Sequence, residues 1–116
     1  MKLPNIFESK ATPRTFRAGD TIFASGEPAH CMYVVKAGKV DILKGGKVVE
    51  TIGPDGFFGE LALVDASARS ASAQAQTDCE LTTIDEKQFL FMVSETPFFS
   101  LRVMREMAAR LRRPAD

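Results

Sequence analysis

Ligands for metal ions and partners for disulfides are scarce in this sequence. Its 116 residues include two cysteines and one histidine. Cys31 and Cys79 lie far apart and neither belongs to a CxxC motif, which argues against a zinc site or a disulfide framework. We expect Cys31, next to the apolar Met32, to be a buried small hydrophobe. His30 stands alone in a turn-like segment, whereas metal-dependent enzymes and haem or iron–sulfur sensors need a set of ligands. These scarcities predict a protein without metal, cofactor or catalytic activity.

An excess of one charge and a long hydrophobic run are also missing. Lysine plus arginine and aspartate plus glutamate number 15 each, so no net field steers the chain to nucleic acid or anionic lipid. The longest unbroken apolar run, Phe89–Val93, is far too short to span a membrane. The N-terminal residues lack the apolar segment of a secretory signal. We therefore expect one cytoplasmic domain over residues 1–116, with neither nucleic acid nor membrane as a direct partner.

Between about residues 10 and 85 the chain consists of short β-like runs separated by turns. The runs cover residues 14–16, 21–23, 31–36, 40–44, 47–52, 70–76 and 80–84. Gly45-Gly46 separates two of them, which is a signal for a two-residue hairpin. Many short strands at near-regular spacing favour a mainly β domain, built as a barrel, a sandwich or a jelly roll.

The hydrophobic period changes at Asp85, and two helices are expected from about residue 86 to 113. Asp85 followed by Gln88 predicts a capping box, and Pro97 suits the first turn of the second helix. An apolar stripe runs along that helix at Leu101, Met104, Ala108 and Leu111. The arginines mostly lie off the stripe: Arg102, Arg105, Arg110, Arg112 and Arg113. Because an isolated helix of this length is marginal in water, it must dock on the strands or on a second chain.

The stretch GFFGELALVDASARSASAQA, residues 56–75, places one carboxylate and one guanidinium among small residues. Gly59 allows a ligand to approach the backbone, and a helical turn over residues 61–63 would offer free N–H groups to an anion. Glu60 can accept hydrogen bonds from sugar hydroxyls, whereas Arg69 and Ser70 can donate to phosphate oxygens. A sugar fused to one phosphate would satisfy all three side chains. The alternative is a surface ion pair between Glu60 and Arg69.

The segment 58–63, FGELAL, followed by Arg69-Ser70-Ala71, resembles the phosphate-binding cassette of cyclic-nucleotide-binding domains. Gly38-Lys39-Val40 before a strand and the Gly45-Gly46 hairpin follow in family order, and residues 104–111, MREMAARL, look like the long helix of bacterial cAMP-receptor-type regulators. The resemblance implies an eight-stranded antiparallel β-roll, also called a double-stranded β-helix or jelly roll. It further implies a short N-terminal helix and two C-terminal helices, with the roll over about residues 10–85.

Carried over from the family, the cassette assigns a role to each of its polar groups. Glu60 would bind the ribose 2′-hydroxyl, and Arg69 the cyclic phosphate with help from Ser70. The backbone N–H groups around the turn would join them, at Gly59, Leu61 and Ala62. Ile42 and Val49 would face the base, and ordinary core packing is an equal alternative for both.

Two departures from the family pattern concern the edges of the site. Ala68 replaces a proline that often precedes the arginine, which we expect to loosen the loop. The base lid of the regulators falls near Pro114. Arg112 or Arg113 could reach the base there, but we favour a solvated helix end for both. Ser70 stands where a threonine often accompanies cGMP acceptance.

The resemblance implies a cyclic-nucleotide receptor module, with cAMP favoured over cGMP as ligand. An effector protein would sense movement of the C-terminal helices, and we expect a monomer or weak homodimer. No helix-turn-helix precedes Asp116, so direct DNA binding is not expected. Two alternatives stay open: an interaction module with a degenerate pocket, and a fragment of a cAMP-receptor-type transcription regulator.

Overall fold

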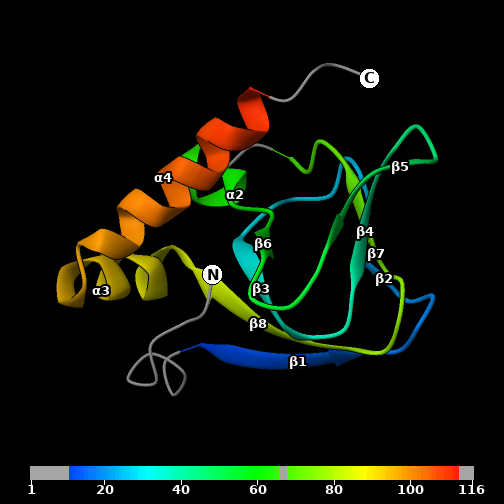
Figure 1. Cartoon of the computed structure of the whole chain (residues 1–116), viewed down its shortest axis with the longest axis horizontal. Coiled ribbons are helices and arrows are strands. Elements are labelled where there is room, and N and C mark those ends of the chain that lie inside the picture. The colour runs from blue at the N-terminus through cyan, green and yellow to red at the C-terminus, as the bar shows by residue number, and fades with distance from the viewer. Residues whose placement is uncertain (1–10, 66–67, 113–116) are drawn as a thin grey trace.

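Eight strands form two antiparallel sheets of four strands each in a computed structural model that describes residues 11–65 and 68–112 (Figure 1). One sheet has the order β1-β8-β3-β6 and the other the order β2-β7-β4-β5. The strands are β1 (Thr12–Phe16), β2 (Thr21–Phe23), β3 (Cys31–Ala37), β4 (Val40–Lys44), β5 (Lys47–Ile52), β6 (Phe57–Phe58), β7 (Ser72–Ala75) and β8 (Cys79–Asp85). The expected mainly β roll is confirmed, whereas the expected short N-terminal helix falls in residues 1–10, outside the described residues.

The predicted hairpin between β4 and β5 is present, with Gly45 and Gly46 as its two-residue turn. Their φ angles are 59° and 78°, the positive values that this class of turn requires and that glycine adopts without strain. Strand β6 was not among the predicted runs. Its two residues pair with Tyr33 and Val34 of β3. Two paired residues are too few to produce an alternating pattern in a sequence.

Strand β3 contributes to two separate hydrophobic clusters, because successive side chains of a strand point to opposite faces. Tyr33 and Val35 belong to a cluster between the two sheets, and Met32 and Val34 to a cluster beneath the helices. Cys31 packs against the first cluster, as predicted for a small hydrophobe, but it is only partly buried.

Three helices are described: α2 (Leu61–Val64), α3 (Glu86–Glu95) and α4 (Phe98–Leu111). Figure 1 shows α3 and α4 together on one side of the roll, with the C-terminal part of α4 beside α2. The predicted capping box is present, since the Asp85 carboxylate accepts from the Gln88 N–H and the Gln88 side chain accepts from the Asp85 N–H, both at 2.8 Å. Pro97 precedes the first residue of α4, as predicted.

The face of α4 that packs on the roll is not the predicted stripe. Phe99 and Val103 are buried in the cluster beneath the helices, and Met107 packs against it. Met104 and Leu111, members of the predicted stripe, are 55% and 86% exposed. Val103 and Met107 lie one position before the predicted Met104 and Ala108, and Phe99 lies two positions before Leu101. The partly buried Arg110 continues the same face of α4 one turn beyond Met107.

Candidate functional site

Glu60 lies at the junction between β6 and α2, where its side chain is carried into the interior. Phe57 and Phe58 are both 2% exposed and fix the approach to this junction. Glu60 is the residue before the first turn of α2, and only 7% of it is exposed. A carboxylate this deep needs hydrogen-bond donors or a cation, because burial penalises its charge.

Arg69 is held by its backbone against the turn that follows β2. Its N–H donates to the Glu27 carbonyl at 2.9 Å, and its carbonyl accepts from the Gly26 N–H at 2.8 Å. Its side chain turns inward and the residue is 8% exposed. The structure therefore buries both charged residues of the predicted cassette, which excludes the alternative of an ordinary surface ion pair.

The Arg69 guanidinium is surrounded by carbonyl oxygens and aromatic rings. Nη1 donates to the Gly59 carbonyl at 3.1 Å and Nη2 to the Cys31 carbonyl at 2.8 Å. The central carbon of the guanidinium, Cζ, lies 4.1 Å from the centroid of the Phe23 ring and 5.8 Å from that of Tyr33. These contacts orient the cation without neutralising it, since neither carbonyls nor rings carry a full negative charge. Its Nε is buried and has no hydrogen-bond partner among the described residues.

Gly59 is required by the close approach of the Arg69 side chain. Its φ is +76°, and a Cβ at this position would lie 2.7 Å from Arg69 Nη1. A residue with a side chain would therefore be strained and would also push the guanidinium away. Gly59 was predicted to let a ligand approach the backbone. In the structure, the Arg69 side chain makes this close approach.

The backbone donors of the predicted turn are partly engaged. The Ala62 N–H donates to the Gly59 carbonyl at 3.3 Å and the Leu63 N–H to the Glu60 carbonyl at 3.0 Å. Leu61 is 47% exposed and begins the single turn of α2. The predicted helical turn is confirmed, but the Ala62 N–H is not a free donor.

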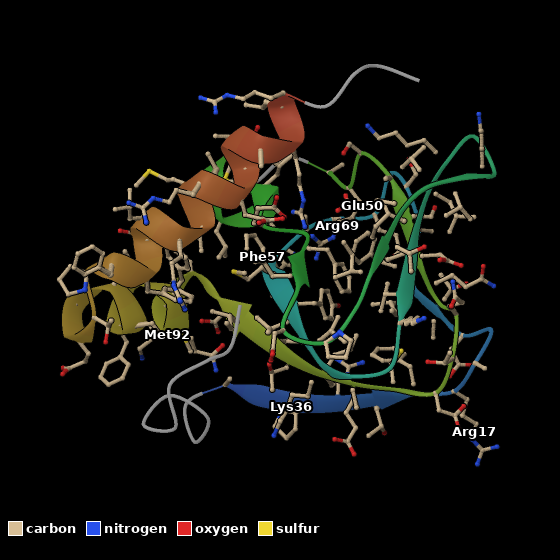
Figure 2. All side chains as sticks on the ribbon, viewed as in Figure 1. Arg17, Lys36, Glu50, Phe57, Arg69 and Met92 are labelled. Carbon is tan, nitrogen blue, oxygen red and sulfur yellow. The ribbon has the colours of Figure 1, made fainter. Side chains whose placement is uncertain are left out.

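Arg110, near the end of α4, reaches the Glu60 carboxylate. Its Nη1 lies 2.6 Å from Glu60 Oε1, and its Nη2 donates to the Phe57 carbonyl. Its Nε is 3.6 Å from Glu50 Oε2 on β5, and its guanidinium lies 5.0 Å from the centroid of the Phe57 ring. Figure 2 shows Glu50, Phe57 and Arg69 on the side of the roll that faces α4. Glu60 is thus paired with Arg110, one of the arginines that the sequence pattern places off the predicted apolar stripe.

Tyr33 forms an uncharged wall beside Arg69. Its ring stacks on that of Phe58 with centroids 5.1 Å apart. Burial, reinforced by the neighbouring Cys31, raises the pKa of Tyr33 to about 12, although Arg69 opposes this shift. The phenol is therefore neutral at physiological pH and does not compensate the Arg69 charge.

The remaining predicted residues lie around the β4–β5 hairpin. Ser70 is exposed and lines a cavity of about 410 Å³ together with Leu43, Lys44 and Gln74, and neither Glu60 nor Arg69 belongs to this lining. Ile42 packs partly against the cluster between the sheets, consistent with the core-packing alternative. Val49 is 38% exposed and falls at an irregularity where Ile42 pairs with Glu50 but Leu43 pairs with Val48.

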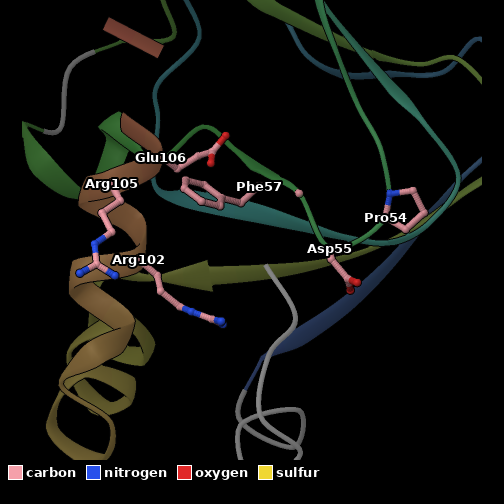
Figure 3. Close-up of a pocket in the computed structure, with 7 residues that line it drawn as sticks. Pro54, Asp55, Phe57, Arg102, Arg105 and Glu106 are labelled. Carbon is pink, nitrogen blue, oxygen red and sulfur yellow. The ribbon is translucent and has the colours of Figure 1, made fainter. Parts of the chain in front are cut away.

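A second cavity, of about 580 Å³, lies between α4 and the turn before β6 (Figure 3). Arg102 and Arg105 line it from the helix, and Asp55 from the turn. Arg112, one of the two arginines considered for contact with the base, is exposed, as expected for a solvated helix end, and Arg113 lies outside the described residues. The α4 arginine that points toward Glu60 is Arg110.

A model of the family described as "Cyclic nucleotide-binding domain" matches residues 13–96, which include β2 to β8, α2, α3 and all of β1 except its first residue. The chain belongs to the cyclic-nucleotide-binding domain family. The resemblance seen in the cassette is thereby confirmed.

A transcriptional regulator is among the relatives of this cyclic-nucleotide-binding domain. A "CRP-like cAMP-activated global transcriptional regulator" of Mycobacterium tuberculosis is 32% identical over 106 residues, which cover 87% of this chain and 47% of the relative. The chain thus spans about half the length of that curated relative.

Solved structures agree with this assignment. The crystal structure of the Thermus thermophilus catabolite activator protein matches with a TM-score of 0.85 and 31% identity, over 93% of this chain and 53% of that one. A structure described under "A cyclic-GMP-dependent signalling pathway regulates bacterial phytopathogenesis" matches with a TM-score of 0.80 and 30% identity, over 90% of this chain and 87% of that one.

Residues 11–65 and 68–112 contain no group of three histidine, cysteine or acidic side chains placed to hold a metal ion. Within the same ranges, no helix combines the length and apolar character needed to cross a bilayer.

Proposed function

We propose that this domain is a cyclic-nucleotide receptor module that binds cAMP in preference to cGMP. Glu60 would accept the ribose 2′-hydroxyl, while Arg69 and Ser70 would hold the cyclic phosphate. The observation that carries the proposal is the state of Arg69. A buried guanidinium with an unpartnered Nε and no neutralising charge in its described contacts favours binding of an anion.

The proposed ligand joins an anion to a sugar. The two charged side chains of the cassette, Glu60 and Arg69, belong to one short segment of the chain. The Arg69 Nη1 bond to Gly59 places the guanidinium beside the residue that precedes Glu60. A cyclic phosphate fused to ribose presents a charged group and a hydroxyl in a fixed relation, which suits two side chains fixed by burial. The two C-terminal helices would pass the binding event to an effector protein, and we expect a non-catalytic, cytoplasmic monomer or weak homodimer.

Two other assignments compete with this one. Glu60 is already paired with Arg110, and Arg69 already bonds two carbonyls, which would also suit an interaction module whose pocket binds no nucleotide. The chain could also serve as the nucleotide-binding part of a cAMP-receptor-type regulator, since it covers 47% of one.

Equilibrium dialysis separates the receptor from the degenerate module. We expect one cAMP bound per chain, with cGMP a weaker competitor because Ser70 lacks the methyl group that restricts a threonine rotamer. The linear nucleotide 5′-AMP is the control, since it lacks the ring that fixes phosphate to sugar. Absence of cAMP uptake at millimolar concentration would refute the receptor proposal, and tighter cGMP binding would refute the preference.

A further inference from the structure

We propose that the exposed face of helix α4 binds an acidic helix of a partner protein, and that the two helices form a short coiled coil. This inference rests on the proposed function in one respect, the expectation that an effector protein contacts the C-terminal helices. It names the chemistry of that effector and the surface that the effector would bind.

The apolar stripe predicted along α4 is not covered by the roll, because a different face of the helix packs there. Met104 and Leu111 are 55% and 86% exposed, and Leu101 and Ala108 are partly exposed. These four positions recur with alternating steps of three and four residues, the heptad spacing of the core positions in a coiled coil. An uncovered helix face with this spacing suits a second helix.

Two arginines lie along one side of this stripe. With Leu101 and Ala108 as the a positions of the heptad, Arg105 and Arg112 are its e positions, and both are exposed. Within residues 11–65 and 68–112, neither arginine forms an ion pair. Positions e and g flank the core of a coiled coil, and their charges determine which helices pair. The face therefore carries two unpaired cations at the positions that select a partner.

A second copy of the chain does not complement this face. The g positions of α4 are Ser100 and Met107, which offer no carboxylate to Arg105 or Arg112. In an antiparallel pair of copies the e positions would face each other, so arginine would lie opposite arginine. Like charges in such positions cost free energy, whereas glutamate or aspartate there would form ion pairs. The charge pattern thus favours an acidic partner helix over self-association.

Fluorescence anisotropy with two synthetic helical peptides, in the absence of nucleotide, tests this inference. Both peptides have isoleucine and leucine at a and d, and they carry either glutamate or lysine at every e and g position. We expect the glutamate peptide to bind about tenfold more tightly than the lysine peptide. The double variant Arg105→Glu, Arg112→Glu should reverse this preference. Arg102→Glu is the matched control, because Arg102 is exposed on the same helix at a b position, and it should change either affinity less than about twofold.

Equal affinity for the two peptides, or no binding of either, would overturn the proposal. Sedimentation velocity shows whether a second copy covers the face instead, and a dimer that persists with the glutamate peptide present would also overturn it. So would binding to vesicles that contain phosphatidylserine without binding of the glutamate peptide, because the face would then contact a membrane. Equilibrium dialysis measures nucleotide binding separately, so failure of the peptide experiment leaves the nucleotide part of the proposed function intact.

Discussion

Arg69 is the residue on which the proposed site depends most, because it combines burial with a charge that its described contacts do not neutralise. Two of its nitrogens reach two carbonyls from different parts of the chain, Gly59 and Cys31. These two hydrogen bonds fix the plane of the guanidinium and therefore the direction of its Nε–H bond. Nε has no hydrogen-bond partner among the described residues. Only arginine has a planar fork that can do this.

Substitution Arg69→Lys should therefore weaken cAMP binding although it keeps the charge. A lysine ammonium cannot hold both carbonyls and a phosphate in one plane, and loss of about 1.5–3 kcal/mol of charge-assisted bonding corresponds to roughly a 10- to 100-fold rise in Kd. Calorimetric titration measures the change, and circular dichroism of the variant checks that the fold is kept. A Kd equal to that of wild type would show that Arg69 does not hold the phosphate.

At this scale the sequence predicted Glu60, Arg69 and Gly59 but not Arg110. The first three share a short segment whose residue types and spacing are specific. Arg110 lies 50 positions from Glu60, and nothing local distinguishes it from the other arginines of α4. The available signal was the spacing of Phe99, Val103 and Met107, which places position 110 on the same face of the helix.

Helix α4 is the element through which a binding event would leave the roll, and its attachment is asymmetric. Its first turns are held by apolar packing, since Phe99 is 3% exposed and its ring lies 5.3 Å from that of Phe89. Its last turn is held by the polar contacts of Arg110. Polar contacts to Glu60, the carboxylate proposed to bind the ligand, can respond to the ligand, whereas the apolar end serves as an anchor.

The two neighbouring phenylalanines at the start of α4 offer a matched test of this anchor. Phe99→Ala should lower the free energy of unfolding by about 3–5 kcal/mol, because it empties a buried site. Phe98 is 70% exposed, so Phe98→Ala should change it by less than about 0.5 kcal/mol. Urea unfolding followed by circular dichroism compares the two variants. Similar losses in both would contradict the burial of one face and the exposure of the other.

Prediction of the elements succeeded where local signals were strong. The Gly45-Gly46 hairpin and the Asp85 capping box are set by neighbouring residues, so they could be located closely from the sequence. Strand β6 and the buried face of α4 depend on tertiary contacts. Strand β6 forms by pairing with β3. Helix α4 has two apolar stripes, and its packing on the roll determines which of them is buried. No local pattern decides such a choice.

At the scale of the whole molecule, the two sheets of the roll form a rigid frame. The cassette lies between these sheets and the helices. The cluster between the sheets fixes Tyr33 and Phe58 beside Arg69, and the cluster beneath the helices fixes Phe57 beside Arg110. Arg69 and Arg110 thus each lie beside a different cluster, and Arg110 is paired with Glu60. A ligand bonded to both Arg69 and Glu60 would connect the sheets to the helices.

The central claim is that cAMP binds between Glu60 and Arg69, and an NMR titration of the isotope-labelled chain tests it most directly. We predict that the amide resonances of Gly59, Leu61, Ala62 and Ser70 shift most and reach their limit at one equivalent of cAMP. Smaller shifts should follow along α4 through Arg110. Saturable shifts confined to other parts of the roll, or no shifts at millimolar cAMP, would contradict the account.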